Sequence, residues 1–215
     1  TYNFVSSQGG NLICAEGTLS INGGTFNFEH AGDYAPFYVE CDATISDAKF
    51  YFTGDEYSTS SCTYFTSGTN GSTIKNCEIT IDKCTKYGFF AGQTGLKIEN
   101  SKFDINVYPQ NSGDTCYGFY GRQQLTIEDS EFDINLHHEE LNSSGYAFYC
   151  SDEISFNDCE IICEDSYHGF YSATGLNLID CKTSLKKCRN MGIRFVGNLN
   201  INGGSYMLLF KINII

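Results

Sequence analysis

Two acidic residues stand at the same place in two copies of a short motif. FDIN reads from Phe103 and again from Phe132, so Asp104 matches Asp133 and Asn106 matches Asn135. If the copies lie on adjacent parallel strands, equivalent side chains are about 4.8 Å apart. Two carboxylates that close raise a pKa or recruit a cation, and calcium prefers such oxygen ligands. The motif predicts a calcium site at Asp104, Asn106, Asp133 and Asn135; the alternative is a solvated pair with splayed side chains.

An aromatic residue closes a second motif, which reads APFY, YGFF, YGFY, YAFY and HGFY. These residues, and the cation that replaces them in the later MGIR, are Tyr38, Phe90, Tyr120, Tyr149, Tyr171 and Arg194. The small residues of the motif, expected to face outward beside them, are Gly88, Gly118, Ala147 and Gly169. A flat aromatic strip of this kind could stack against sugar rings. Two alternatives stay open: the rings only stabilise a sheet by stacking on one another, or the alternation has the opposite phase and buries the strip.

Both motifs belong to a repeat that covers nearly the whole chain. Its pattern is apolar, x, apolar, x, Asn/Asp/Gly, small, x, apolar, x, apolar, as in LKIENSKFDI and LTIEDSEFDI. The second apolar position falls at Ile21, Ile45, Ile74, Ile98, Ile127, Phe156, Leu178 and Ile201. Every step lies within the range of about 20 to 50 residues that indicates a solenoid, a propeller or an array. A propeller blade needs four strands, which the shortest steps cannot supply, and the pattern of leucine-rich repeats is absent.

The repeat predicts an all-β, right-handed parallel β-helix of about eight coils with three short strands per coil, around GFY, LxI and FxI. A sharp corner between the last two requires residue types that tolerate left-handed backbone angles. Such residues recur there: Gly23, Asp47, Asn76, Asn100, Asp129, Asp158, Asp180 and Gly203. The next residue is always small and is expected to face inward: Gly24, Ala48, Cys77, Ser101, Ser130, Cys159, Cys181 and Gly204.

Charged residues and cysteines also follow the repeat. The row Lys49, Glu78, Lys102, Glu131, Glu160 and Lys182 mostly alternates in sign, which favours salt bridges between coils. The eleven cysteines include several at inward positions, which indicates buried thiols more than a disulfide framework. Cys159 could still pair with Cys181, and Cys84 with Cys116; a secreted fold with two or three bridges is the alternative.

The repeat resembles the parallel β-helix of the pectate-lyase-like superfamily, at the level of architecture. That superfamily includes lyases, hydrolases, carbohydrate-binding modules and adhesins, so the resemblance does not fix a function. Members that cleave pectate use calcium on stacked acids together with an Arg or Lys base. No Arg or Lys stands at a matching outward position of this strand between residues 80 and 136, and of the polygalacturonase-like motifs only His168-Gly169 is echoed. The sequence contains no complete catalytic set, so enzymatic activity stays open and is disfavoured.

A net charge of −13 disfavours binding to nucleic acid and to anionic membranes, and no apolar run is long enough for a membrane helix. We expect residues 1–215 to form one domain, a non-catalytic extracellular or cell-surface module that recognises a polysaccharide or another surface along a flat solenoid face. The alternatives are a polysaccharide lyase or hydrolase and a structural repeat of a larger adhesin. Calcium is the one cofactor considered. The apolar segment YMLLFKINII lacks a polar cap, which suggests end-to-end self-association through the C-terminal coil.

Overall fold

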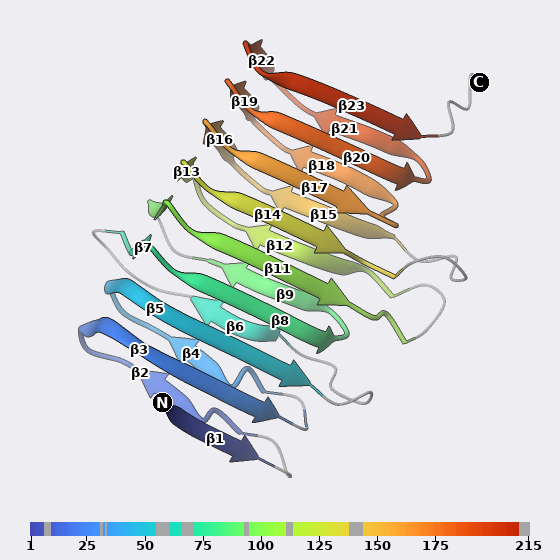
Figure 1. Cartoon of the computed structure of the whole chain (residues 1–215). Coiled ribbons are helices and arrows are strands. Elements are labelled where there is room, and N and C mark those ends of the chain that lie inside the picture. The colour runs from blue at the N-terminus through green and yellow to red at the C-terminus, as the bar shows by residue number, and fades with distance from the viewer. Residues whose placement is uncertain are drawn as a thin grey trace.

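The structure is a computed structural model that describes residues 1–6, 10–30, 32, 34–54, 61–65, 71–92, 95–110, 114–137 and 144–210. In these segments the regular structure is all strand, and no helix that could cross a membrane is present. Two sheets contain only parallel strands, and the chain passes from one sheet to the other in every coil (Figure 1). These observations confirm an all-β parallel β-helix of about eight coils.

The smaller sheet contains the GFY-type blocks. Its eight strands in the described residues are β2 (Ile13–Ala15), β4 (Phe37–Val39), β6 (Ser61–Phe65), β9 (Tyr87–Ala91), β12 (Cys116–Gly121), β15 (Gly145–Cys150), β18 (His168–Ser172) and β21 (Met191–Phe195).

The larger sheet contains the LxI and FxI blocks in two rows. The LxI row is formed by β7 (Thr73–Lys75), β10 (Leu96–Glu99), β13 (Leu125–Glu128), β16 (Glu153–Asn157), β19 (Gly175–Ile179) and β22 (Asn198–Asn202). The FxI row is formed by β1 (Tyr2–Ser6), β8 (Glu78–Cys84), β11 (Lys102–Val107), β14 (Glu131–Asn135), β17 (Glu160–Glu164), β20 (Lys182–Cys188) and β23 (Ser205–Phe210). Two strands, β3 (Leu19–His30) and β5 (Ala43–Gly54), run through both rows.

The prediction of three short strands per coil is therefore wrong for the coils of β3 and β5. These two strands pair residue by residue on both sides of the corner, from Leu19 with Ala43 to His30 with Gly54. Their continuous ladder joins the two rows into one sheet of 15 strands among the described residues.

The predicted register of the repeat is confirmed along the stack. Ile45 is the partner of Ile21 and of Ile74, and Ile98 is the partner of Ile74 and of Ile127. The row then continues through Phe156, Leu178 and Ile201. Because equal residues of successive coils stand above one another, each column of the repeat becomes a row of side chains along the solenoid.

The core consists of stacked rows that meet between the two sheets. Phe103 stacks on Phe132 within one row, with ring centroids 4.7 Å apart, and meets Phe119 of the other sheet edge to face at 6.0 Å. These three side chains are almost completely buried. Offset and edge-to-face contacts of this kind add about 0.5–1.5 kcal/mol per pair to the free energy gained by burial.

The corner residues have the left-handed conformation that their types predict. The φ angles are 54° at Asp47, 53° at Asn76, 44° at Asn100, 50° at Asp129 and 52° at Asp158. Asp180, Gly23 and Gly203 also have positive φ. The inward small side chains that follow satisfy corner backbone groups: the Ser101 hydroxyl accepts a hydrogen bond from the Cys77 N–H and donates one to the Glu99 carbonyl.

The outward position predicted for the small residues of the GFY blocks is wrong. Gly88, Gly118, Ala147 and Gly169 are buried, and a Cβ at Gly118 would overlap a methyl group of Ile134. The small residue and the following Phe both face inward, so strict alternation fails within the block. As a result the residue before the pair and the residue after it both face outward, which creates two outer rows instead of one.

Candidate functional site

The acidic pair lies on the outer face of the larger sheet. Asp104 and Asp133 are register partners on β11 and β14, and both are exposed. The Asn106 amide donates a hydrogen bond to Asp104 Oδ1 at 3.0 Å, and Asn106 Oδ1 lies 3.1 Å from Nε2 of His137. Partial burial and then the charges of Asp104 and Glu164 raise the pKa of the Asp133 carboxyl. The predicted residues are thus brought together, with His137 as an addition that the sequence pattern did not single out.

Two cations, Lys102 on the strand of Asp104 and Lys186 on β20, act on this pair. Lys186 of β20 forms an ion pair with Glu164, and the charges of Lys186 and Lys102 oppose part of the rise in the Asp133 pKa. Within the described part of the chain, no group of three or more His, Cys, Asp or Glu side chains is placed to hold a metal ion. Calcium at Asp104, Asn106, Asp133 and Asn135 stays a prediction that rests on the register and on oxygen ligands.

The predicted aromatic strip is a continuous ladder on the outer face of the smaller sheet. Phe90 stacks on Tyr120, Tyr120 on Tyr149, and Tyr149 on Tyr171, with ring centroids 4.8–5.0 Å apart and nearly parallel planes. The guanidinium of Arg194 lies over the Tyr171 ring at 5.4 Å. Tyr38 joins the ladder through Tyr64, which lies in the segment TYFT (63–66), where the GFY-type motif is degenerate.

A second ladder runs beside the first and consists of Tyr87, Tyr117, Tyr146 and His168. Its rings meet those of the first ladder edge to face; Tyr117, for example, lies 4.9 Å from Tyr120 at an interplanar angle of 80°. Each inner ring therefore has both faces covered by its neighbours in the stack. The strip presents ring edges to solvent, so it offers a sugar ring no face to stack on.

Burial tunes the titratable groups of the second ladder. It raises the pKa of the Tyr87, Tyr117 and Tyr146 hydroxyls. Burial, with a smaller contribution from the charge of Arg194, lowers the pKa of His168 to about 4. His168 is therefore neutral near pH 7 and packs where the other coils have tyrosine. These pKa shifts keep the tyrosines and His168 of the second ladder uncharged near pH 7, which favours a role in stacking over one in proton transfer.

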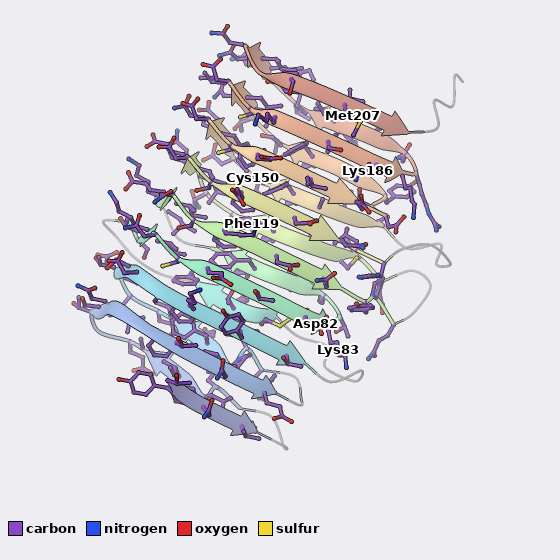
Figure 2. All side chains as sticks on the ribbon, in the orientation of Figure 1. Asp82, Lys83, Phe119, Cys150, Lys186 and Met207 are labelled. Atoms are coloured by element: carbon purple, nitrogen blue, oxygen red, sulfur yellow. A yellow bond between two sulfur atoms is a disulfide. The ribbon has the colours of Figure 1, made fainter. Side chains whose placement is uncertain are left out.

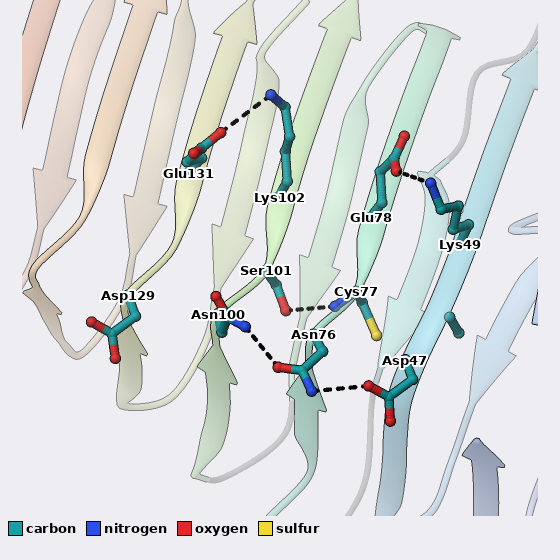
Figure 3. Close-up of a pocket in the computed structure, with 11 residues that line it drawn as sticks. Asp47, Lys49, Asn76, Cys77, Glu78, Asn100, Ser101, Lys102, Asp129 and Glu131 are labelled. Atoms are coloured by element: carbon teal, nitrogen blue, oxygen red, sulfur yellow. Dashed lines mark hydrogen bonds and ion pairs between the residues drawn. The ribbon is translucent and has the colours of Figure 1, made fainter. Parts of the chain in front are cut away.

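A polar groove follows the corner of the solenoid (Figure 3). One wall is the corner row, in which the Asn76 amide donates to Asp47 Oδ1 at 2.9 Å and the Asn100 amide donates to Asn76 Oδ1 at 2.8 Å. The other wall is the charged row, with ion pairs between Lys49 and Glu78 at 2.6 Å and between Lys102 and Glu131 at 3.2 Å. This part of the groove has a volume of about 500 Å³.

The groove continues along the next coils for another volume of about 350 Å³. The corner row there consists of Asp129, Asp158 and Asp180, and the charged row continues with Glu160 and Lys182. The sequence contained both rows, but its interpretation assigned the first to backbone geometry and the second to salt bridges. In each repeat that lines the groove, one buried small residue separates the corner residue from the charged residue. This constant spacing is the sequence feature that could have predicted a groove between the two rows.

The cysteines support a reduced core with one bridge. Cys62 and Cys84 form a disulfide, and the other nine thiols are free, eight of them buried. The predicted alternative pairing of Cys84 with Cys116 is therefore wrong. The Cys159 thiol donates to the Asn157 carbonyl and the Cys181 thiol to the Ile179 carbonyl, each at 3.2 Å. The neighbouring Cys159 lowers the pKa of Cys181, so the two residues interact as predicted while both remain thiols.

Comparison of the chain with protein-family models, with curated proteins and with solved structures gave no match.

Proposed function

We propose that this protein is a non-catalytic recognition module that binds a linear, hydroxyl-rich polysaccharide in the corner groove between Asp47 and Lys182. The observation that carries the proposal is the groove itself, which crosses successive coils and offers at each step one Asp or Asn of the corner row and one charged side chain of the other row. Carboxylates accept hydrogen bonds from hydroxyl groups, and lysines and amides donate them. A polymer with a regular repeat can use such a row more than once.

The negative charge of the groove limits which class of polysaccharide it could bind. Residues 123–181 contain 13 Asp and Glu side chains and no Lys or Arg. Five of these acids, Asp129, Glu131, Asp158, Glu160 and Asp180, line the second half of the groove together with Lys182. A polyuronate would meet a like charge there, and like charges across an interface weaken binding. The proposed ligand is therefore a neutral or amine-bearing polysaccharide, which disfavours a pectate-lyase type of activity.

Two further features support an extracellular or cell-surface location as part of this proposal. The Cys62–Cys84 disulfide is typical of oxidising compartments. Extended polysaccharides are also most accessible outside the cell. The buried state of eight thiols is compatible with such a location, because burial protects them from exchange.

The test is a pull-down with insoluble polysaccharides, followed by a glycan array with neutral, amine-bearing and uronate polymers. In the test variant, Lys102→Ala with Glu131→Ala removes one pair from the groove wall. This pair is exposed, and pairs of this type contribute about 0–1 kcal/mol to stability, so the fold is expected to remain. We expect binding of a neutral or amine-bearing polymer to fall at least about tenfold, a change of about 1.4 kcal/mol.

The control is Lys75→Ala with Glu99→Ala on the LxI face outside the groove, which removes an ion pair of similar length, 3.1 Å, and also the contact of Glu99 with Lys97 at 2.6 Å. It should leave binding unchanged. Equal loss in both variants, or binding confined to uronate polymers, would reject the groove as the binding site. Release of oligosaccharide during the assay would favour the lyase or hydrolase alternative instead.

A further inference from the structure

The two ends of the solenoid carry opposite charge. From Thr1 to Ala48 the chain contains six acidic side chains and no Lys or Arg: Glu16, Glu29, Asp33, Glu40, Asp42 and Asp47. From position 182 onward there are six cationic side chains and no Asp or Glu: Lys182, Lys186, Lys187, Arg189, Arg194 and Lys211. The coils are stacked in chain order, so for the listed residues that the structure describes, all but positions 33 and 211, this segregation becomes a separation of charge along the solenoid axis (Figure 1).

Both ends also expose apolar side chains of the core rows. Ile201 is 44% and Leu208 43% exposed, although Leu178 and Leu185, their partners one coil earlier, are completely buried. Met207, labelled on the last coil in Figure 2, belongs to the outer row that Ser184 continues and is 46% exposed. At the opposite end Tyr2 is 56% exposed and stacks on Phe26 with one ring face. In the described residues β23 pairs only with β20, and β1 only with β3.

We propose that two copies of this chain associate head to tail, the cationic end with β21–β23 of one copy binding the acidic end with β1–β3 of the other. All neighbouring strands of both sheets are parallel and in register, so the same one-coil step would place β1 of the second copy beside β23. The contact uses different surfaces on the two copies. It is a heterologous contact that leaves a free end on each side and can propagate into a filament.

Beside the paired strands the two ends face each other across a gap, and electrostatic attraction acts across it. β1 stands one coil before β2, so pairing of β23 with β1 leaves β21 and β2 two coil steps apart, about 10 Å at about 4.8 Å per step. Arg194 stands in the row that Cys14 continues at the other end, close in sequence to Glu16. Charges at this distance attract when the Debye length is about 30 Å, at about 0.01 M salt, and are largely screened when it is about 8 Å, at about 0.15 M.

The experiment is sedimentation velocity of the whole chain over a range of concentrations at both ionic strengths. The expected result is association at low salt that weakens at least tenfold at the higher salt. Arg194→Glu and Glu16→Arg should each weaken association at least tenfold at low salt, and the double variant should restore it, because the swap recreates an opposite pair.

The control is Arg122→Glu, which changes the net charge as Arg194→Glu does. Arg122 is exposed and lies over the Phe90 ring at 5.5 Å, as Arg194 lies over Tyr171, but in the middle of the solenoid. Circular dichroism of each variant shows whether the strands are retained. A monomer at every concentration and salt, as expected if another segment or protein normally covers these ends, would overturn the proposal. Association that salt strengthens, or that Arg122→Glu weakens equally, would overturn it as well.

Discussion

The Asp133 carboxylate is held in a place that disfavours its charge. It lies beside Asp104 and near Glu164, and partial burial deprives it of some of its hydration. A carboxyl group whose pKa is higher in the folded than in the unfolded state destabilises the fold when it is ionised. The destabilisation disappears as the pH falls through the raised folded pKa, because the carboxyl group then becomes neutral. This local cost is what a bound cation would offset.

We therefore expect Asp133→Asn to raise the melting temperature at neutral pH. The gain should shrink as the pH falls through the acidic range in which the wild-type carboxyl group becomes protonated. Thermal unfolding of both proteins across this range measures the difference. A melting temperature that Asp133→Asn lowers at neutral pH would show that the ionised carboxylate is stabilised by its neighbours.

Calcium gives a second prediction at the same residues. If Asp104, Asn106, Asp133 and Asn135 bind calcium, its addition should raise the melting temperature of the wild type, because a ligand that binds only the folded state stabilises it. The same addition should have no effect on Asp133→Asn. Magnesium is the comparison ion, since it demands a tighter geometry and dehydrates reluctantly. If millimolar calcium leaves the melting temperature of the wild type unchanged, the prediction of a calcium site at these residues is wrong.

At the scale of elements, the repeated strand generates two aromatic ladders from one short block. The inward pair of a small residue and Phe leaves the residues on either side facing outward, so rings stack within each ladder and cross between ladders. The predicted strip is real as a structure. Its covered ring faces favour the alternative in which the ladder stabilises the sheet.

Tyr120→Ala combined with Tyr149→Ala tests that role. The double variant removes three stacking contacts, each of about 0.5–1.5 kcal/mol, so the free energy of unfolding should fall by at least about 1.5–4.5 kcal/mol. The edge-to-face contacts with Tyr87, Tyr117 and Tyr146 are lost as well. Denaturation by urea measures it. Tyr120→Phe with Tyr149→Phe retains the rings and should stay close to the wild type. If the alanine variant loses polysaccharide binding while its stability is unchanged, the aromatic strip is a binding surface and not only a stabilising ladder.

At the scale of the whole molecule, burial inside the solenoid decides which cysteine thiols a reagent can reach. Cys62 and Cys84 lie at the two ends of one coil, and the bridge closes that coil on itself. Cys14 is exposed, whereas the other eight free thiols are buried along the solenoid. A thiol reagent should modify one cysteine in the native protein, nine after denaturation, and eleven after reduction. Fewer than nine in the denatured, unreduced protein would point to a second disulfide, with Cys159 and Cys181 as the pair in contact.

The sequence by itself determined how the coils of the β-helix stack on one another. The spacing of its apolar residues sets the coil, and the recurrence of Asp, Asn and Gly sets the corner, because few residue types accept positive φ there. Both follow from local geometry, so Asp104 and Asp133, or Tyr120 and Tyr149, could be paired from the sequence alone.

Only the tertiary structure decided which way the side chains face and which surfaces are hollow. Gly88 and Gly118 face inward against Ile105 and Ile134 of the opposite sheet, which leave no room for a Cβ, and the sequence of one strand contains no information on that contact. The groove exists because the corner row and the charged row stand apart across a bend. The repeat in the sequence specifies which residues are neighbours along the solenoid axis. The packing of the two sheets against each other specifies which side chains a ligand can reach.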